Sequence, residues 1–269
     1  TIYSSLKNSG IYSEQPLSSS SLRISDMEAF HITEPKNLSL IVPNFMHADY
    51  GAKMTGSIFI RGIGSRMDQP AMGLYIDHVP VLNKNNFDFD YFDLQRIDVL
   101  RGPQGTLYGR NTIGGIIDVH TLSPFSYQGT RLYAEYGNGN TLNLRISTYH
   151  KPGDKVAFSF AFNHQQSDGF FTNRYNGSRA DRIRTESGRF KLQVQLSDNW
   201  TMENVTSANL VEQKGFAYSL YDENTGKTGE INHNDPCTYD RVGLTNGLIF
   251  NYTGKQFKFS STTSYQYMD

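Results

Sequence analysis

The chain has 269 residues and a formal net charge of -1, with 19% charged and 37% hydrophobic residues. That length is enough for one large or two ordinary domains, and the near-neutral charge argues against nucleic acid as a partner. The single cysteine, Cys237, excludes an internal disulfide and a cysteine-based zinc site. No run of eighteen apolar residues is present, so a transmembrane helix is excluded. Transmembrane strands are not excluded, because their alternating pattern keeps overall hydropathy low.

The N-terminal part of the chain is expected to form two short helices after an extended start. Residues 1–15 are polar and predict an extended terminus, and a first strand is expected at the end of residues 16–24. Ser25 and Glu28 have the spacing of a capping box, in which Glu28 reaches back to the backbone of Ser25, so a helix is predicted to begin at Ser25. A second short helix, ending near Pro43, is indicated by three apolar residues, Leu38, Ile41 and Val42.

The segment from Ser57 to Thr121 has the pattern of short strands joined by tight loops. Its apolar runs are bounded by Gly, Pro, Asn or Asp, and they predict strands at Ser57–Ile60, Met72–Ile76, Arg96–Leu100 and Ile116–Val119. Between the last two runs, residues 101–115 contain glycine at positions 102, 105, 109, 114 and 115. Such a density of glycine predicts positive φ angles or very close approaches of the backbone.

Two interpretations of these glycines are open, a phosphate-binding loop or a compact domain that fits inside a narrow enclosure. The P-loop pattern Gly-x-x-x-x-Gly-Lys-Ser/Thr is absent, and Gly62-Ile63-Gly64 lacks the third glycine of a dinucleotide-binding loop. No two histidines have the i, i+4 spacing of a helical metal site, and no Gly-x-Ser-x-Gly elbow is present. A soluble enzyme built on glycine loops therefore stays only as an alternative, which solubility without detergent would favour.

Three stretches of the segment carry a distinctive pattern. They are Ile60–Arg66 (IRGIGSR), Gly73–Pro80 (GLYIDHVP) and, above all, Arg96–Thr112 (RIDVLRGPQGTLYGRNT). In order and spacing, over about a hundred residues, they resemble the plug domain of TonB-dependent outer-membrane receptors. The resemblance implies an α+β plug seated in a 22-stranded barrel, whose lumen it closes. It also implies a set of residues that shape the plug: Gly62, Gly102, Pro103, Gly105, Tyr108, Gly109, Gly114 and Gly115.

The resemblance also implies where a ligand would bind. In the family the ligand rests between the outer face of the plug and the extracellular loops, which corresponds to Gly64–Pro70 and Leu82–Phe89 here. The implied ligand-binding residues at this plug apex are Gly64, Ser65, Arg66, Asp68, Gln69, Asn83, Lys84 and Asn85. Their mixed polarity suits an anionic or neutral metal chelate, although solvated loop residues would look the same. Arg61 and Arg101 end plug strands, and the resemblance implies that they pair with barrel glutamates and hold the plug closed.

Beyond Ser123, apolar and polar residues alternate with a period of two, which predicts a series of antiparallel strands. Seven strands are predicted, at Gly129–Tyr136, Thr141–Tyr149, Lys155–Gln165, Gly188–Leu196, Trp200–Leu210, Arg241–Tyr252 and Gln256–Tyr267. The polar face of these strands is expected to point inward. Its members Arg145, Lys191 and Gln193 are predicted to contact the plug or water.

Alternation alone fits a soluble sandwich as well as a transmembrane barrel, but two features favour the barrel. Tight turns and long polar connections alternate, the long ones being Ser167–Thr185 and Gln213–Asp240. The tight turns are predicted at Lys151–Asp154, Ser197–Asn199 and Thr253–Lys255. Aromatic residues beside these turns predict a girdle at the membrane interface, formed by Tyr149, Trp200, Tyr252 and Phe257.

Seven strands are too few to enclose a plug. The first and last would run in the same direction, so they cannot close an antiparallel barrel, and open edges in hydrocarbon leave backbone groups unpaired. We therefore expect a partial barrel, with this chain as the N-terminal part of a longer receptor. A second chain that supplies the missing strands is the less favoured alternative.

The sequence thus predicts an N-terminal extension at residues 1–15 near the segment that contacts TonB, a plug at residues 16–125, and the first transmembrane β-barrel strands at residues 126–269. The predicted function is active import of a scarce nutrient through the outer membrane of a Gram-negative bacterium. The expected partners are TonB and outer-membrane lipid, with no cofactor and no enzymatic activity. A ferric siderophore is the expected cargo, with cobalamin, haem or an oligosaccharide as alternatives. A truncated receptor that binds ligand without transport is a further alternative.

Overall fold

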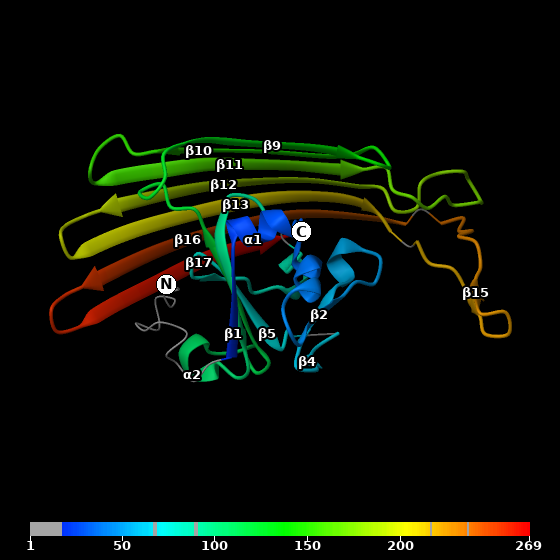
Figure 1. Ribbon diagram of the computed structural model, residues 1–269, viewed down its shortest axis with the longest axis horizontal. Helices are drawn as coiled ribbons and strands as arrows, with labels where there is room; N and C mark the ends of the chain where they lie inside the picture. Colours follow the sequence, from blue (N-terminus) through cyan, green and yellow to red (C-terminus); the bar gives the residue numbers. More distant parts are fainter. Residues whose placement is uncertain (1–17, 67–68, 89–90, 216, 236) are drawn as a thin grey trace.

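The computed structural model describes residues 18–66, 69–88, 91–215, 217–235 and 237–269. Figure 1 shows two parts, a long sheet of seven strands and a smaller unit of short strands and helices that lies against one face of that sheet. We call the smaller unit the plug (described residues up to 127) and the long sheet the wall (residues 129–269). None of the described helices is both long enough and apolar enough to cross a membrane.

The plug is built on two sheets. The larger sheet has the strand order β1-β7-β8-β5-β6, in which only β5 and β8 pair in parallel. Its strands are β1 (Ser18–Arg23), β5 (Met72–Ile76), β6 (Val79–Pro80), β7 (Leu94–Arg101) and β8 (Gly115–Thr121). The smaller sheet consists of β2 (Phe45–Ala48), β3 (Ser57–Ile60) and β4 (Ile63–Gly64). All four apolar runs predicted as strands are confirmed, as β3, β5, β7 and β8.

Five short helical segments accompany the plug sheets in the described part of the chain. They are α1 (Ile24–Ala29), η2 (Pro35–Leu40), η3 (Lys53–Thr55), η4 (Lys84–Asn86) and α2 (Gly105–Tyr108). One apolar cluster joins α1 and η2 to the sheet, and its members include Met27, Leu38, Val42, Ile60, Leu74, Ile97, Val99, Ile117 and Val119. The predicted second helix is therefore present, but as a 3-10 helix that begins at Pro35 and ends before Pro43.

The predicted capping box at Ser25 is wrong. The helix α1 begins at Ile24, and the carboxylate of Asp26 accepts a hydrogen bond from the backbone N–H of Arg23 at 3.0 Å. Asp26 therefore has the role that the sequence pattern gave to Glu28, and the capping box begins at Arg23, two residues before Ser25. The carboxylate of Glu28 instead points away from the helix and lies 3.1 Å from the guanidinium of Arg131 on the wall.

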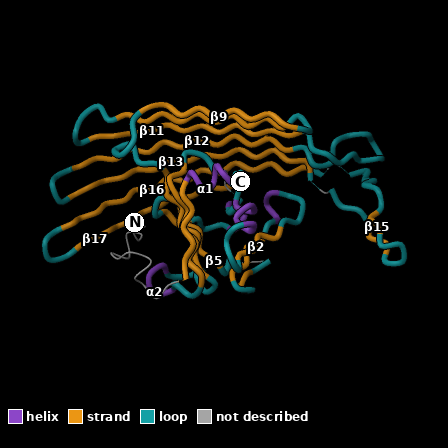
Figure 2. Tube along the Cα trace, viewed as in Figure 1, coloured by secondary structure: helices purple, strands orange, loops and turns teal. Residues whose placement is uncertain are grey.

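The wall is a meander in which each strand pairs antiparallel with the next long strand. Its strands are β9 (Gly129–Gly137), β10 (Thr141–His150), β11 (Val156–Ser167), β12 (Ile183–Gln195), β13 (Trp200–Lys214), β16 (Thr238–Thr253) and β17 (Lys258–Met268). All seven predicted strands are confirmed, although β12 begins five residues before the predicted start at Gly188. The second long connection contains a small hairpin of β14 (Tyr221–Asp222) and β15 (Lys227–Thr228), seen at the right of Figure 2.

The two faces of the wall differ as the alternation predicts. On β11, Ala157, Ser159 and Ala161 are buried against the plug, whereas Phe160 and Phe162 are exposed on the opposite face. At the short-turn end, three of the four predicted girdle residues cluster: the ring of Tyr252 lies 5.1 Å from Trp200 and 4.9 Å from Phe257. Tyr149 is a correction, because its side chain is 1% exposed and packs against Tyr127 on the inner face.

The glycine-rich segment forms a loop closed by backbone hydrogen bonds, from Gly102 N–H to Gly114 O at 2.9 Å and from Gln104 N–H to Thr112 O at 3.0 Å. Four of its five glycines have a positive φ or a close neighbour, and Gly105 is the exception. Gly115 is the most demanding, because its φ is 146° and an added Cβ would lie 2.1 Å from the carbonyl oxygen of Leu100. The predicted backbone constraint is thus confirmed, except at Gly105.

Candidate functional site

The tip of the β5–β6 hairpin is fixed to the wall by a buried ion pair. Asp77 and His78, the two turn residues, have φ angles of 47° and 67°, which are uncommon outside glycine. Asp77 accepts hydrogen bonds from the backbone N–H and the hydroxyl of Thr121 at 2.9 and 2.6 Å, and its carboxylate lies 3.0 Å from the ammonium of Lys191. Burial alone would raise the pKa of Asp77, but Lys191 and Thr121 outweigh it and hold the pKa well below its usual value.

A polar chain continues from this ion pair along the wall. Lys191 lies 3.8 Å from a wall carboxylate, Glu203 on β13. The side-chain amide of Gln193 donates to Glu203 at 2.5 Å, and the hydroxyl of Ser123, at the end of the plug, donates to the amide oxygen of Gln193 at 2.7 Å. The prediction that Lys191 and Gln193 face the lumen and contact the plug is therefore confirmed.

Two more buried ion pairs join the plug to the wall. The guanidinium of Arg241 on β16 lies 2.9 Å from the carboxylate of Asp88, and Arg189 on β12 pairs with Asp93 while its guanidinium stacks on the ring of Phe92 at 4.8 Å. Burial raises the pKa of Asp93 to about 6, although the charge of Arg189 opposes the shift. Removing one partner of such a pair leaves an unpaired buried charge and costs about 3–5 kcal/mol.

These pairs have the opposite polarity to the pairs that the sequence implied. In the described part of the chain the plug supplies carboxylates and the wall supplies cations. Arg61 is exposed. Arg101 is half-buried and donates to four oxygens of its own plug, two serine hydroxyls and two carbonyls, which belong to Ser18, Ser20, Ser19 and Pro43. The pairing of Arg61 and Arg101 with barrel glutamates stays a prediction.

A second cluster of charged groups lies within the plug, on the sheet face turned away from the main apolar core. Asp98 on β7 and Asp118 on β8 are directly opposite in register, and both are buried. Asp98 lies 2.7 Å from Arg96 and 3.3 Å from the Nε2 of His120. Burial raises the pKa of Asp118 to about 6. Burial lowers the pKa of His78, beside His120, to about 4.

The two predicted apex loops contact each other through Lys84 and Arg66. The Lys84 ammonium donates to the carbonyl of Arg66, the Arg66 guanidinium lies over the ring of Tyr50 at 4.9 Å, and the Asn83 side chain accepts from the Asn85 N–H at 2.9 Å. Gln69 is exposed, whereas Gly64 and Ser65 are half-buried. Asp68 lies outside the described residues.

A cavity of about 280 Å³, here called the loop-side cavity, lies between the plug and the long-loop ends of β11–β13. Its charged and polar lining includes Glu34, Lys36, His47, Asp49, Lys53, Gln165, Asp181 and Gln213. The ammonium of Lys36 lies 3.0 Å from Glu34 and 3.3 Å from Asp49. The sequence reasoning missed these residues. No local pattern marks them, because charged residues between positions 34 and 53 are no denser than in the whole chain.

The two long loops of the wall pack on each other above this cavity. The Asn173 side chain donates to the carbonyl of His233 at 2.8 Å and accepts from the His233 N–H at 3.1 Å. The ring of Tyr218 lies over Gly51 of the plug. Other aromatic side chains on the loops are exposed, namely Phe170, Phe171, Tyr175 and Tyr221. The loops therefore present aromatic rings beside a cavity of mixed charge.

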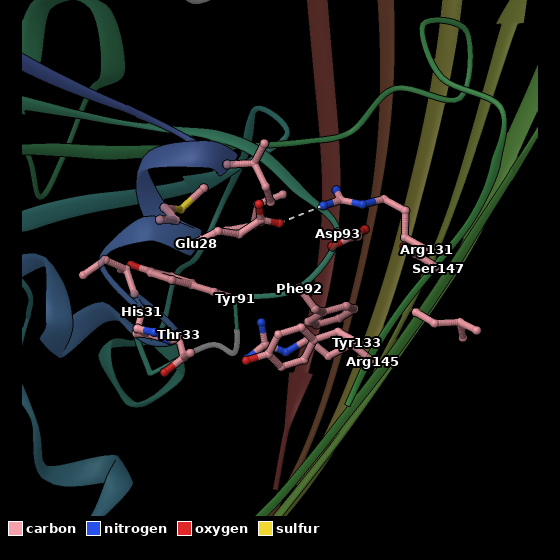
Figure 3. A pocket seen from close by; sticks show the side chains of 15 residues that line it. Glu28, His31, Thr33, Tyr91, Phe92, Asp93, Arg131, Tyr133, Arg145 and Ser147 are labelled. Atoms are coloured by element: carbon pink, nitrogen blue, oxygen red, sulfur yellow. Dashed lines mark hydrogen bonds and ion pairs between the residues drawn. The ribbon is translucent and has the colours of Figure 1, made fainter. Parts of the chain in front are cut away.

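A second cavity, of about 190 Å³, lies between α1 and the β9–β10 part of the wall, and we call it the α1 cavity. Figure 3 shows the side chains of Glu28 and Arg131 reaching across it toward each other. Its lining also includes Met27, Ile32, Thr33, Tyr91, Phe92, Tyr133, Arg145 and Ser147. The predicted inward direction of Arg145 is confirmed. The Glu28 and Arg131 side chains are 62% and 34% exposed, so their ion pair contributes only about 0–1 kcal/mol.

The comparison with known proteins agrees with this architecture. Residues 12–116 match the family model of the TonB-dependent Receptor Plug Domain. The chain is 30% identical over 244 residues to the pesticin receptor of Yersinia pestis, in an alignment that covers 87% of this chain and 36% of that receptor. The chain is homologous to the TonB-dependent receptors.

Solved structures place both parts of the chain at the N-terminal portion of TonB-dependent receptors. The ferric yersiniabactin uptake receptor FyuA from Yersinia pestis superimposes with a TM-score of 0.83 at 26% identity, over 95% of this chain and 41% of that chain. The ferric-catecholate import receptor Fiu from E. coli, in its open form, shares the fold with a TM-score of 0.72 at 14% identity, over 96% of this chain and 39% of that chain. The chain thus spans well under half the length of these receptors.

The wall is an open sheet, with β9 and β17 as its two edge strands. An open sheet beside a complete plug core is the architecture of a partial barrel, as the sequence predicted. Within the described residues, no group of three or more His, Cys, Asp or Glu side chains is arranged to hold a metal ion.

Proposed function

We propose that this chain forms the plug and first barrel strands of a receptor that imports a ferric siderophore across the outer membrane of a Gram-negative bacterium, with energy supplied through TonB. The observation that carries the proposal is the attachment of the plug to the wall by buried ion pairs, beside a cavity of mixed charge under aromatic loops. The pairs Asp77–Lys191 and Asp88–Arg241 join the plug to the wall. The loop-side cavity offers a ligand both signs of charge.

The outer face of the wall supports a place in the membrane. One row across that face is apolar and exposed at Ile146, which lies opposite Phe162 on one side and Leu132 on the other. The cluster of Trp200 and Tyr252 at the short-turn end is an interfacial arrangement. We therefore expect lipid to contact the outer face of the wall, while the plug contacts its inner face.

The choice of cargo rests on the site and on the relatives together. The pesticin receptor and the ferric yersiniabactin receptor are the relatives with the highest identities given above. The loop-side cavity, at about 280 Å³, is close to the lower limit of about 300 Å³ for small-molecule sites. The rings of Phe170 and Tyr218 and the cation of Arg66 would suit a chelate that carries aromatic groups and oxygen ligands.

Equilibrium binding to the intact protein in detergent tests this choice. Tryptophan and tyrosine fluorescence is titrated with ferric siderophores of the phenolate, catecholate and hydroxamate types, with their iron-free forms, and with cobalamin, haem and oligosaccharides. We expect one class of ferric siderophore to bind, and Arg66→Ala to weaken its binding. The exposed Lys227→Ala variant, on the distant β14–β15 hairpin, serves as the matched control. Selective binding of cobalamin, haem or an oligosaccharide would contradict the proposal.

A further inference from the structure

The outer face of the wall changes from apolar to polar between β12 and β13. Residues that are directly opposite in register lie on the same face of a sheet. One register row across the outer face consists, from β11 to β17, of Phe160, Phe190, Thr206, Asn246 and Tyr265. The next row consists of Phe158, Leu192, Asn204, Leu248 and Thr263. Both rows are apolar on β11 and β12, and both become polar at β13.

Three polar side chains of these rows form one hydrogen-bonded group, Asn204, Thr206 and Asn246, which we call the outer patch. The side-chain amide of Asn246 donates to the hydroxyl of Thr206 at 2.7 Å and to Oδ1 of Asn204 at 3.5 Å. The Thr206 hydroxyl donates to the same oxygen of Asn204 at 3.3 Å, and the Asn204 amide donates to the carbonyl of Gly247 at 3.2 Å. All three side chains are half-buried, so part of this polar surface stays open.

The outer patch lies within the membrane-spanning part of its strands. Trp200 and Tyr252, whose rings lie 5.1 Å apart, mark the short-turn end of β13 and β16. Toward the long loops, the carboxylates of Glu212 and Asp240 are opposite in register and exposed. Residues 201–211 lie between Trp200 and Glu212, which matches the roughly 9–11 residues of a transmembrane strand. The outer patch is inside this span, where the surrounding lipid is hydrocarbon.

Hydrocarbon is a poor neighbour for this group. Amide and hydroxyl groups are costly in an apolar layer unless they are hydrogen-bonded, and lipid tails offer neither donors nor acceptors. Within the described residues, Oδ1 of Asn246 accepts no hydrogen bond. The outer patch is uncharged and carries both donors and acceptors. The surface that suits it is therefore another uncharged protein surface with both kinds of group, since lipid headgroups lie at the membrane surface.

We propose that the outer patch is an interface between two copies of this receptor, related by a two-fold axis along the membrane normal. A two-fold contact brings the same residues together from both sides, so each copy offers acceptors to the donors of the other. Hydrogen bonds between polar side chains favour association inside a membrane. The inference rests on the proposed function only in that the wall lies in the outer membrane, and it adds an assembly that import does not require.

Photocrosslinking of the intact protein in outer membranes tests the interface. Two copies with different affinity tags are expressed together, and a benzophenone-bearing phenylalanine replaces Tyr265, which is exposed beside the outer patch. Irradiation is expected to give a product with twice the mass of the receptor that carries both tags. The matched control places the photoreactive residue at Phe160, which is exposed in the same register row. Equal two-tag products from both positions, or a Tyr265 product that contains only lipid or a different protein, would overturn the proposal.

A double variant, Asn246→Leu with Thr206→Val, tests the polar groups themselves. It is expected to reduce the two-tag product from Tyr265 roughly ten-fold, because the two-fold axis doubles each lost hydrogen bond of modest strength. The control Thr148→Val removes an outward hydroxyl from the same row on β10 and should leave the product unchanged. An unchanged product from a folded double variant would overturn the proposal, and the comparison of Tyr265 with Phe160 decides it if the variant does not fold. The proposed function fails separately, only if the unmodified protein neither binds nor imports any ferric siderophore.

Discussion

The carboxylate of Asp77, at the tip of a plug hairpin with two positive φ angles, lies 3.0 Å from the ammonium of Lys191 on wall strand β12. The two side chains are 5% and 4% exposed. A turn conformation that is costly in isolation is therefore maintained by contacts to Thr121 and to the wall. The hairpin is both a structural element of the plug and its attachment to the wall.

The first prediction concerns this ion pair. Lys191→Met should destabilise the attachment of the plug by about 3–5 kcal/mol, because Asp77 becomes an unpaired buried carboxylate. Adding Asp77→Asn should recover much of the loss, because the buried charge is then removed. Hydrogen exchange of the β5–β6 amides and leakage of small antibiotics into cells measure the two effects. A double variant as unstable as the single one would contradict the argument from charge.

The second prediction is a pH dependence at Asp118. Its pKa is about 6 in the folded plug against 3.8 for the free side chain, so the folded state binds the proton more tightly. The contribution of Asp118 to the free energy of unfolding is fully present below about pH 4 and is lost as the pH rises through about 6. Asp118→Asn resembles the protonated form and should stabilise the plug by about 1–3 kcal/mol above pH 6, with no effect below pH 4.

Hydrogen exchange of the β7–β8 amides over this pH range measures the difference between variant and wild type. The difference reports the titration of Asp118 together with that of His120, whose Nε2 lies 3.6 Å from the Asp118 carboxylate. The exposed turn variant Asp154→Asn is the control, and it should not change β7–β8 exchange. A stabilisation by Asp118→Asn that is equal at pH 4 and pH 7 would show that protonation is not its cause.

The third prediction concerns Arg101, which holds β1 through donors to two serine hydroxyls and two carbonyls. Arg101→Ala should loosen β1 by about 1–3 kcal/mol, because hydrogen bonds from a charged donor are lost at a half-exposed site. Faster hydrogen exchange in residues 18–23, with β8 unchanged, is the expected result. An equal increase in hydrogen-exchange rate across the whole plug would contradict this local role of Arg101. Combining Arg101→Ala with Arg61→Ala should raise leakage of small solutes if the pairing with barrel glutamates is correct.

The fourth prediction compares two glycines of the same loop. Gly115→Ala should prevent correct assembly of the plug, because the new Cβ would lie 2.1 Å from the carbonyl oxygen of Leu100. Gly105→Ala should be tolerated, because its nearest neighbour is the Thr112 hydroxyl at 3.8 Å and α2 accepts alanine well. The amount of folded protein in outer membranes, judged by resistance to protease, measures both. Equal tolerance of the two variants would contradict the close approach at Gly115.

The sequence predicted the strands of this fold well where apolar and polar residues alternate clearly. Alternation over residues 141–149 and 155–165 located the wall strands and their faces, because a buried side and an exposed side impose a period of two. It failed at Tyr149, whose place beside a turn suggested an interface although its register position is inward. It also failed at Ser25, because Asp26 caps the helix from Arg23, two residues before the predicted N-cap.

The site was less predictable than the fold. Motif positions such as Arg61 and Arg101 were visible in the sequence, whereas the attachment of Asp77 to Lys191 joins residues 114 positions apart. No local pattern reports such a distant pairing. The charged residues of the loop-side cavity were likewise missed, because Lys36 and Asp181 line one cavity only when the plug lies against the wall.

Uptake of radioactive iron tests the central claim most directly. The intact protein is expressed in a Gram-negative strain that lacks its own siderophore receptors, and cells under iron limitation are given the ferric siderophore that binds best. The account predicts uptake that requires both this protein and functional TonB, and that stops when the proton gradient is dissipated. Binding of the siderophore without any TonB-dependent uptake would contradict the account and indicate a receptor that does not transport.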